Sequence, residues 1–171
     1  VKPILMKFES MVHEVSVVLG KQVQFSIEGK EVRLNRGDLD KLQDALVHII
    51  RNALDHGIES PSERKQKRKN EWGTLEISCN QIDDMVLICI KDDGRGLDPN
   101  KLVEIAQKKG VLTPEQAAKM NSEEKLQIIF IPGFSSKDQA TELSGRGVGL
   151  DVVKNTLTTL GAQIRIESEI D

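Results

Sequence analysis

Residues 46–57 have the sequence LVHIIRNALDHG, and this stretch decides the fold. Apolar residues in and before it recur at spacings of four, three and four, which places them on one face of a helix with 3.6 residues per turn. The members of this predicted core face are Leu42, Leu46, Ile49 and Ala53. We therefore expect a helix over residues 39–56 that is capped by Asp38 and ends at Gly57.

A second stripe on the same helix is polar. His48, Asn52 and Asp55 follow each other at spacings of four and three, about a quarter turn from the apolar face at about 100° per residue. They are therefore expected along the border of the core. An imidazole, a carboxamide and a carboxylate at such a border could also be ordinary solvated side chains, so other parts of the chain must decide their role.

Length and composition favour a soluble globular domain. The 171 residues suit one domain with a real core, and they contain no run of 18 apolar residues and no charged-then-apolar leader. A formal charge of -3, one Trp and no Tyr make nucleic acid an unlikely partner. Cys79 and Cys89 are too few for a disulfide scaffold, so we expect reduced thiols in a cytoplasmic protein, the first facing the core and the second facing away.

The other expected elements follow from periodicity and from Gly and Pro signals. They are a helix over 4–19 that ends at Gly20, a hairpin near 23–27 and 32–34, paired strands over 74–79 and 86–90, helices over 99–109, 114–120, 123–129 and 147–160, and a last strand at 164–166. Residues 131–146 show no periodicity, and a loop of this length is usually a functional lid or disordered.

A run of charge follows the first long helix. Five of the seven residues 63–69 are Lys or Arg, and a short helix after Ser60 and Pro61 fits the sequence. A charge run usually forms a solvated face, and contact with phosphate or a partner is the alternative.

Two motifs are rich in glycine. Asp92-Asp93-Gly94-Arg95-Gly96 follows a buried strand, and strand parity directs Asp92 toward the interior, where its carboxylate needs a partner. There it could accept a hydrogen bond from an exocyclic amine such as that of adenine, while the glycines admit a flat ligand; a simple turn is the alternative. The sequence GRGVGL, residues 145–150, leads into a helix whose N-terminal amides could bind phosphate.

Together these motifs are far more specific than each alone. A helix with Asn52, the strand-end Asp92 motif and the glycine-rich segment at 145–149 resemble, in order and spacing, the nucleotide-binding boxes of the ATPase superfamily shared by gyrase, Hsp90, MutL and the histidine kinases (GHKL). The sequences HIIRNALDHGIE (residues 48–59) and FIPGFS (130–135) are similar to those of the ATP-binding kinase domain of chemotaxis histidine kinases of the CheA family. The resemblance covers nearly the whole chain.

This resemblance implies an α/β fold, a two-layer sandwich of the Bergerat type with a mixed β-sheet, helices on one face and a Gly-rich ATP lid. The expected cofactors are ATP and Mg²⁺. Asn52 is implied as the Mg²⁺ ligand, and His48, in the place of the glutamate of gyrase-like hydrolases, as the base or orienting group for phosphoryl transfer. Asp92 is implied as the acceptor for the adenine N6 amine.

The remaining implied contacts with the nucleotide fall on the helix end, the strand end and the lid. They are Asp55 and His56, of which one is expected to be structural, Gly94 and Gly96 at the base, and Ser135, Ser136, Lys137, Gly145, Arg146, Gly147, Val148, Gly149 and Leu150 in the lid. Solvent exposure is the favoured interpretation of Arg95 and Arg146, and an ion pair or a phosphate contact is the alternative. Phe130 and Phe134 are expected to anchor the lid to the core.

The implied function is that of one module, residues 1–171, of a two-component chemotaxis kinase that transfers the γ-phosphoryl group to a histidine on a separate phosphoacceptor domain of the same or a partner subunit. Dimerisation and receptor-coupling domains are expected elsewhere in the full-length protein, with no membrane insertion of this part. The family normally continues into a final strand, so the chain is expected to be cut short. The alternatives are a GHKL-type ATP hydrolase, a non-catalytic nucleotide-dependent docking module and a structural adaptor.

Overall fold

The computed structural model describes residues 2–29, 32, 36–134 and 149–170. The chain divides into two compact units, residues 1–95 and residues 96–171. The expectation of a single domain stays a prediction.

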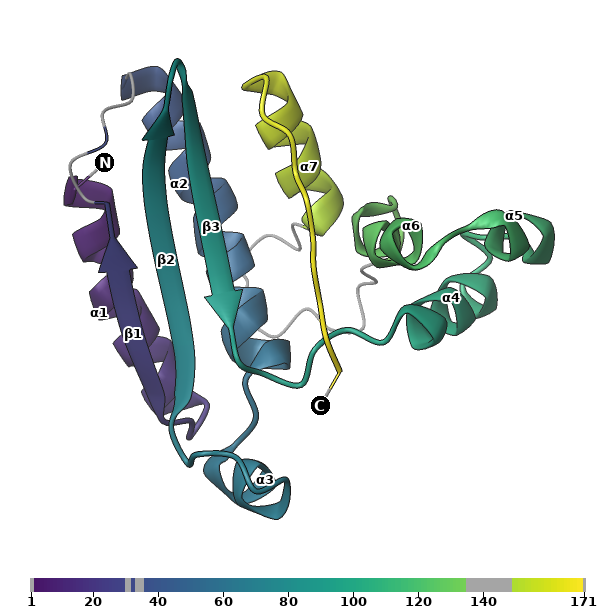
Figure 1. Ribbon diagram of the computed structural model, residues 1–171, viewed down its shortest axis with the longest axis horizontal. Coiled ribbons are helices and arrows are strands. Elements are labelled where there is room, and N and C mark those ends of the chain that lie inside the picture. Colours follow the sequence, from purple (N-terminus) through teal and green to yellow (C-terminus); the bar gives the residue numbers. More distant parts are fainter. Residues whose placement is uncertain (1, 30–31, 33–35, 135–148, 171) are drawn as a thin grey trace. The chain divides into compact units, whose positions relative to one another are not determined.

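The first unit contains a mixed three-stranded sheet in the order β1-β2-β3 (Figure 1). The strands are β1 (Val23–Glu28), β2 (Gly73–Ile82) and β3 (Met85–Asp92). β2 pairs antiparallel with β3, as expected for the paired central strands, and β1 pairs parallel with β2. The expected hairpin is therefore wrong for β1: Val32 lies in no strand, and residues 33–35 lie outside the described part. Parallel strands cannot be joined by a tight turn, and here the connection contains a long helix.

The helices of this unit are α1 (Lys2–Val18), α2 (Arg36–Asn52) and α3 (Pro61–Gln66), and a π-helical turn, η1 (Ala53–Gly57), extends α2. α1 ends at Gly20 as expected, because a φ of 63° there suits a residue without a side chain. α2 begins at Arg36, so Asp38 lies in its first turn and does not precede the helix as its cap. The predicted end at Gly57 is confirmed.

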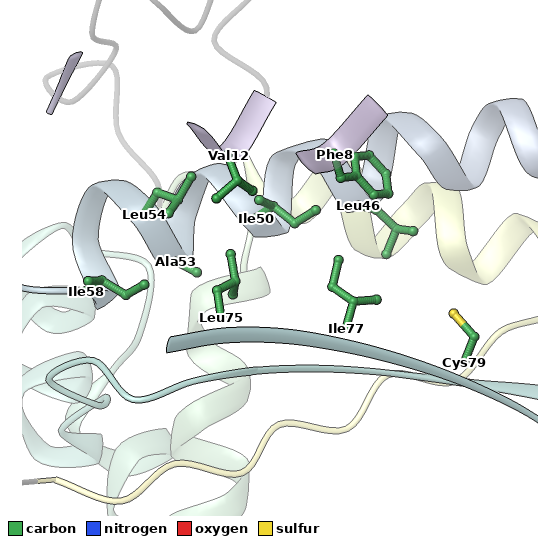
Figure 2. Close-up of a cluster of buried hydrophobic side chains, with 10 residues drawn as sticks. All are labelled: Phe8, Val12, Leu46, Ile50, Ala53, Leu54, Ile58, Leu75, Ile77 and Cys79. Atoms are coloured by element: carbon green, nitrogen blue, oxygen red, sulfur yellow. The ribbon is translucent and has the colours of Figure 1, made fainter. Parts of the chain in front are cut away.

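The core of the first unit lies between α1, α2 and one face of β2 (Figure 2). Its buried members are Phe8, Val12, Leu46, Ile50, Ala53, Leu54, Ile58, Leu75, Ile77 and Cys79. Leu46 and Ala53 were predicted, whereas Ile49 is only half-buried. Because α2 packs against both α1 and the sheet, the buried face of the helix contains Ile50, and it continues to Leu54 in η1. Cys79 is buried and Cys89 exposed, as predicted.

The second unit is helical in its described part. It contains α4 (Pro99–Lys108), α5 (Pro114–Lys119), α6 (Ser122–Leu126), the 3-10 turn η2 (Gln127–Phe130) and α7 (Leu150–Thr159). Three of these helices begin with a side-chain cap, from Asp98, Thr113 and Asn121. Leu102, Ala106 and Ile128 are central to its small core.

The predicted last strand is wrong. Ile164 and Ile166 alternate in exposure with their neighbours as in a strand, yet residues 162–170 form no ladder with any described strand. Alternation is a property of the sequence, whereas a strand requires a hydrogen-bonded neighbour. None of the helices in the described part is long and apolar enough to span a membrane.

Candidate functional site

His48 lies on α2, half-buried at the border of the core. Burial, and next the neighbouring Arg51 guanidinium, lower the pKa of its imidazole below the ordinary value, although a backbone hydrogen bond acts in the other direction. A lowered pKa keeps the ring neutral at pH 7, with one nitrogen able to accept a hydrogen bond or a proton.

Asn52 is the last residue of α2, and the π-helical turn begins directly after it. The turn is closed by the Ile58 amide, which donates to the Ala53 carbonyl over five residues at 2.7 Å. Single π turns inside helices occur frequently at functional sites. Here the wider turn changes the angular spacing after Asn52, and Asp55 is half-buried while His56 is exposed.

Lys21, which lies between α1 and β1, supports this turn. Its Nζ donates to the carbonyl oxygens of Leu54 and Asp55, the latter at 2.9 Å. Burial lowers the pKa of Lys21, and the Asp55 carboxylate partly offsets that effect. Carbonyls at a helix end need such partners, so Lys21 holds the backbone of the predicted site residues in place. Nothing in the sequence around Lys21 indicated this role, since its two acceptors are more than 30 residues away.

Asp92 ends β3 and lies against the end of η1. Its Oδ1 accepts the Gly94 amide at 2.9 Å, and a Cβ built on Gly57 would come within 3.1 Å of the same oxygen. A Cβ on Gly94 would lie 2.3 Å from the Gly57 backbone. The backbones of the strand end and the helix end therefore approach so closely that no side chain fits between them. The Arg95 amide adds a hydrogen bond to the Gly57 carbonyl at 3.0 Å.

The Asp92 carboxyl group has protein atoms on one side and solvent on the other. Burial raises its pKa above the ordinary value, while the hydrogen bond from Gly94 acts to lower it. Strand parity predicted that Asp92 faces the interior, but Asp92 is exposed at the end of β3, and its carboxylate accepts a hydrogen bond from the Gly94 amide. The structure thus brings together Asp92, Gly94 and the turn that carries Asp55 and His56.

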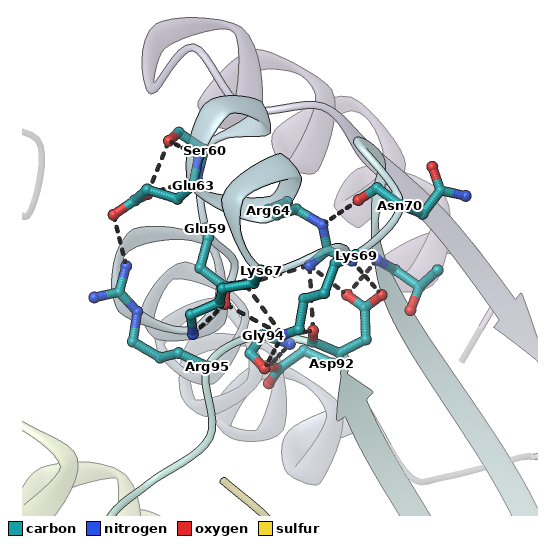
Figure 3. Close-up of polar contacts among 12 residues, drawn as sticks. Glu59, Ser60, Glu63, Arg64, Lys67, Lys69, Asn70, Asp92, Gly94 and Arg95 are labelled. Carbon is teal, nitrogen blue, oxygen red and sulfur yellow. Dashed lines mark hydrogen bonds and ion pairs between the residues drawn. The ribbon is translucent and has the colours of Figure 1, made fainter. Parts of the chain in front are cut away.

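The charged run at 63–69 is partly buried, contrary to the expectation of a solvated face. Its first residues form α3, which starts at Ser60 with a capping box and Pro61, as the sequence suggested. Arg64 is 1% exposed and contacts the equally buried Glu59 and the Asp93 carboxylate (Figure 3). Lys69 donates to Glu59 and to the carbonyl oxygens of Asp93 and Gly94.

Glu59 is the anionic centre of this cluster. Burial alone would raise the pKa of its carboxyl group, but hydrogen bonds from Lys67, from its own backbone amide and from Lys69 outweigh burial and lower the pKa to about 2. Glu59 therefore remains ionised in the folded protein at any moderate pH.

This lowered pKa predicts an acid-dependent loss of stability. A carboxyl group with a folded pKa of about 2, against 4.5 in the ordinary state, stabilises the fold above pH 4.5 and loses that contribution as the pH falls toward 2. The loss attributable to Glu59 is on the order of 3 kcal/mol. In urea denaturation at a series of pH values, Glu59→Gln should be the less stable protein at pH 7 and approach the wild type near pH 2. A constant difference between the two proteins at all pH values would contradict the assignment.

The other predicted site residues belong to the second unit or lie outside the described part. Gly96 has a φ of 69°, and a Cβ there would lie 2.0 Å from the Glu169 carbonyl oxygen, so it faces the C-terminal segment. Gly149 is the residue before α7, and Leu150 is its first residue. Ser135, Ser136, Lys137, Gly145, Arg146, Gly147 and Val148 all fall on residues outside the described ranges.

The aromatic residues of the second unit pack as anchors. Phe130 is buried in η2, with the Lys154 ammonium 5.5 Å from its ring centroid. Phe134 packs on the small core, and the Lys109 ammonium lies 5.5 Å from its ring centroid. Both positions agree with the expected packing role.

A cavity of about 420 Å³ lies elsewhere in the first unit, between α1, β1 and Trp72. His13, Ser16 and Phe25 are among its lining residues, and none of the predicted site residues is. This cavity is therefore separate from the polar stripe of α2 and from Asp92.

Comparison with known proteins agrees with the geometry. The chain is 41% identical over 98% of its length to "Chemotaxis protein CheA" of Bacillus subtilis, 44% over 95% to "Gliding motility regulatory protein" of Myxococcus xanthus, and 43% over 96% to "Sensor histidine kinase CheAY" of Helicobacter pylori. It spans 25%, 21% and 20% of the length of these relatives.

The chain also matches a family of proteins as a whole. Residues 37–171 match the family described as "Histidine kinase-, DNA gyrase B-, and HSP90-like ATPase". This range includes η1, β3 and all of α2 after Arg36, and these elements carry His48, Asn52 and Asp92. The chain therefore belongs to the family of histidine kinase-, DNA gyrase B- and HSP90-like ATPases, and this membership implies that it binds ATP.

Proposed function

We propose that this chain is the ATP-binding catalytic module of a chemotaxis histidine kinase, which passes the γ-phosphoryl group of ATP to a histidine on a separate phosphoacceptor domain. The observation that carries the proposal is the close approach of Asp92 to Gly57, at the end of the helix that bears His48 and Asn52. The similarity to proteins named chemotaxis protein and sensor histidine kinase supports the reaction type.

The residues at the strand end fit an adenine base. An ionised carboxylate has about four acceptor sites, and the Gly94 amide uses one of them on Asp92. The remaining sites can accept from the exocyclic N6 amine. Gly57 and Gly94 have no side chains beside the Asp92 carboxylate, so a planar ring can approach the backbone closely.

Asn52, at the end of α2, fits an Mg²⁺ ion that takes most of its ligands from the phosphates of ATP and from water. Among the described residues, no group of three or more His, Cys, Asp or Glu side chains is arranged to hold a metal ion. Mg²⁺ in nucleotide sites commonly uses one or two protein oxygens and takes its other ligands from phosphates and water. Asn52 would supply such an oxygen, and the ion would neutralise charge on the phosphates.

His48 has the protonation state that the proposed transfer needs. A nitrogen of the incoming histidine attacks the γ-phosphorus, the bond from phosphorus to the bridging oxygen breaks, and ADP departs. Because His48 is neutral, it can accept the hydrogen bond or the proton of the other ring nitrogen of the acceptor. We place it as the base or orienting group, one helical turn from Asn52.

Substitution of His48 tests this role. We expect His48→Gln to slow phosphotransfer about 10²- to 10⁴-fold, as loss of a general base does, with ATP affinity nearly unchanged. The assay combines the chain, Mg²⁺, γ-labelled ATP and a supplied histidine-containing phosphoacceptor domain. His13→Gln is the matched control, because His13 is exposed on α1.

The same assay separates the alternatives. Label that is acid-labile on the acceptor histidine supports the kinase, and release of inorganic phosphate without labelled acceptor would identify a hydrolase. ATP binding without either product would leave a docking module. Unchanged transfer by His48→Gln would remove this residue as the base.

We place this module within a larger signalling kinase. The partners are the phosphoacceptor domain and, in the full-length protein, dimerisation and receptor-coupling domains. We place the module in the cytoplasm, in keeping with the free Cys79 and Cys89 thiols.

A further inference from the structure

Arg64 is a buried charged side chain of the first unit, and its polar contacts are drawn in Figure 3. It is 1% exposed, and each of its guanidinium nitrogens has an acceptor. Nε donates to the Asn70 carbonyl at 2.6 Å, Nη1 to Glu59 Oε2 at 3.3 Å and to Asp93 Oδ1 at 3.2 Å, and Nη2 to Asp93 Oδ2 at 2.7 Å. The fork-to-fork pairing with Asp93 fixes both groups in one plane.

Asp93 is the residue directly after the proposed base acceptor. Its Oδ1 also accepts the Thr74 amide of β2 at 2.8 Å, and its carbonyl oxygen accepts from Arg64 Nη1 at 3.2 Å. Lys69 donates to the carbonyls of Asp93 and Gly94 at 3.0 and 2.9 Å. The backbone on the C-terminal side of Asp92 is therefore held by two cations and one strand.

Removing one member of this network, such as Glu59, leaves the other charges without a partner and is costly, but this cost does not explain why a charged network is present at all. Replacing a whole buried ion-pair network by apolar side chains is often neutral or stabilising, so stability alone does not require charged residues at these positions. What the network supplies is a single backbone geometry for residues 92–94. A carboxylate that recognises one amine must be held to within about 0.5 Å, and this requires supporting groups whose own positions are fixed.

We propose that Arg64 is a positioning residue for base recognition: with Glu59 and Lys69 it fixes the Asp93–Gly94 backbone, so that the Asp92 carboxylate points at the exocyclic amine of adenine. This inference rests on the proposed ATP binding. The charged run would thus contribute to nucleotide selectivity. Arg64 would act through Asp93 and would not itself contact the nucleotide.

The test compares ATP with inosine triphosphate, which has a carbonyl oxygen in place of the N6 amine. Loss of that hydrogen bond should make the wild type prefer ATP by about 10- to 150-fold in Kd. In Arg64→Lys the charge remains but the fork is lost, and we expect the preference to fall at least threefold, with inosine triphosphate affinity within about twofold of wild type. A purely structural role would weaken both nucleotides by the same factor and leave the ratio unchanged.

Two further variants keep the test decisive. Asp93→Asn removes the bidentate pair from the other side and should lower the same ratio, which covers the case in which Arg64→Lys does not fold. Lys65→Met is the matched control, because it removes one positive charge from an exposed position of α3 and should keep the wild-type ratio. Wild-type preference in both Arg64→Lys and Asp93→Asn would overturn this inference alone. If the wild type binds neither nucleotide, the proposed function falls together with it.

Discussion

Asp92→Asn should weaken ATP binding about 10- to 150-fold, the effect of losing one charge-assisted hydrogen bond. The substitution keeps the shape of the side chain, but an amide has one acceptor oxygen and one donor nitrogen. If the oxygen accepts from Gly94, as Asp92 Oδ1 does now, the donor nitrogen faces the N6 amine. If the amide turns round, its nitrogen faces the Gly94 amide instead. One hydrogen bond is lost in either orientation.

The same variant should fold at least as stably as the wild type at pH 7. Burial raises the pKa of Asp92, so the folded protein holds this proton more tightly than the unfolded chain does. Stability therefore falls as the pH rises through the folded pKa, and an amide avoids this cost because it never ionises. Calorimetric titration and urea denaturation check the two halves of the prediction. Strong ATP binding by Asp92→Asn would remove Asp92 as the acceptor, and weak binding with a large loss of stability would indicate a structural role.

Ile50→Ala should lower the free energy of unfolding by about 2–5 kcal/mol, the range for truncating a fully buried isoleucine. Ile50 has no exposed surface and lies among residues of α1, α2 and β2. The matched control is Ile49→Ala on the adjacent, half-buried position, where we expect a loss of about 1 kcal/mol. The two changes alter helix propensity equally, so their difference reports burial alone.

Denaturant midpoints for these two variants measure that difference. A larger loss at Ile49 would show that the buried face of α2 is the one predicted from periodicity, and equal losses would contradict the greater burial of Ile50.

The sequence predicts local features of this protein well. The end of α1 at Gly20, the start of α3 at Ser60 and the end of the long helix at Gly57 all follow from residues within one turn of the boundary. The faces of Cys79 and Cys89 follow from the period of two in a strand.

Features that depend on distant residues are those that the sequence did not reveal. The partner of β1 is β2, about 50 residues later, and no turn signal can report a parallel pairing. Ile49 and Ile50 both fit a 3.6-residue period within its tolerance, and the position of α1 selects Ile50. The burial of Arg64 depends on Glu59 and Asp93, so its run of charges looked solvated.

The site was predicted in part from the sequence. Asp92, Gly94 and the end of the long helix do come together in the first unit, where the motif order placed them. The π-helical turn and its support by Lys21 were not predicted, because the wide turn leaves no signature in residue spacing and its partner lies far back in the chain.

Amide hydrogen exchange with and without an ATP analogue and Mg²⁺ would locate the bound nucleotide within the chain. We expect slower exchange at residues 52–57 and 92–95, with little change around Trp72 and the cavity beside α1. Unchanged exchange at 52–57 and 92–95 under saturating nucleotide, or protection centred on the cavity instead, would contradict the proposed ATP site.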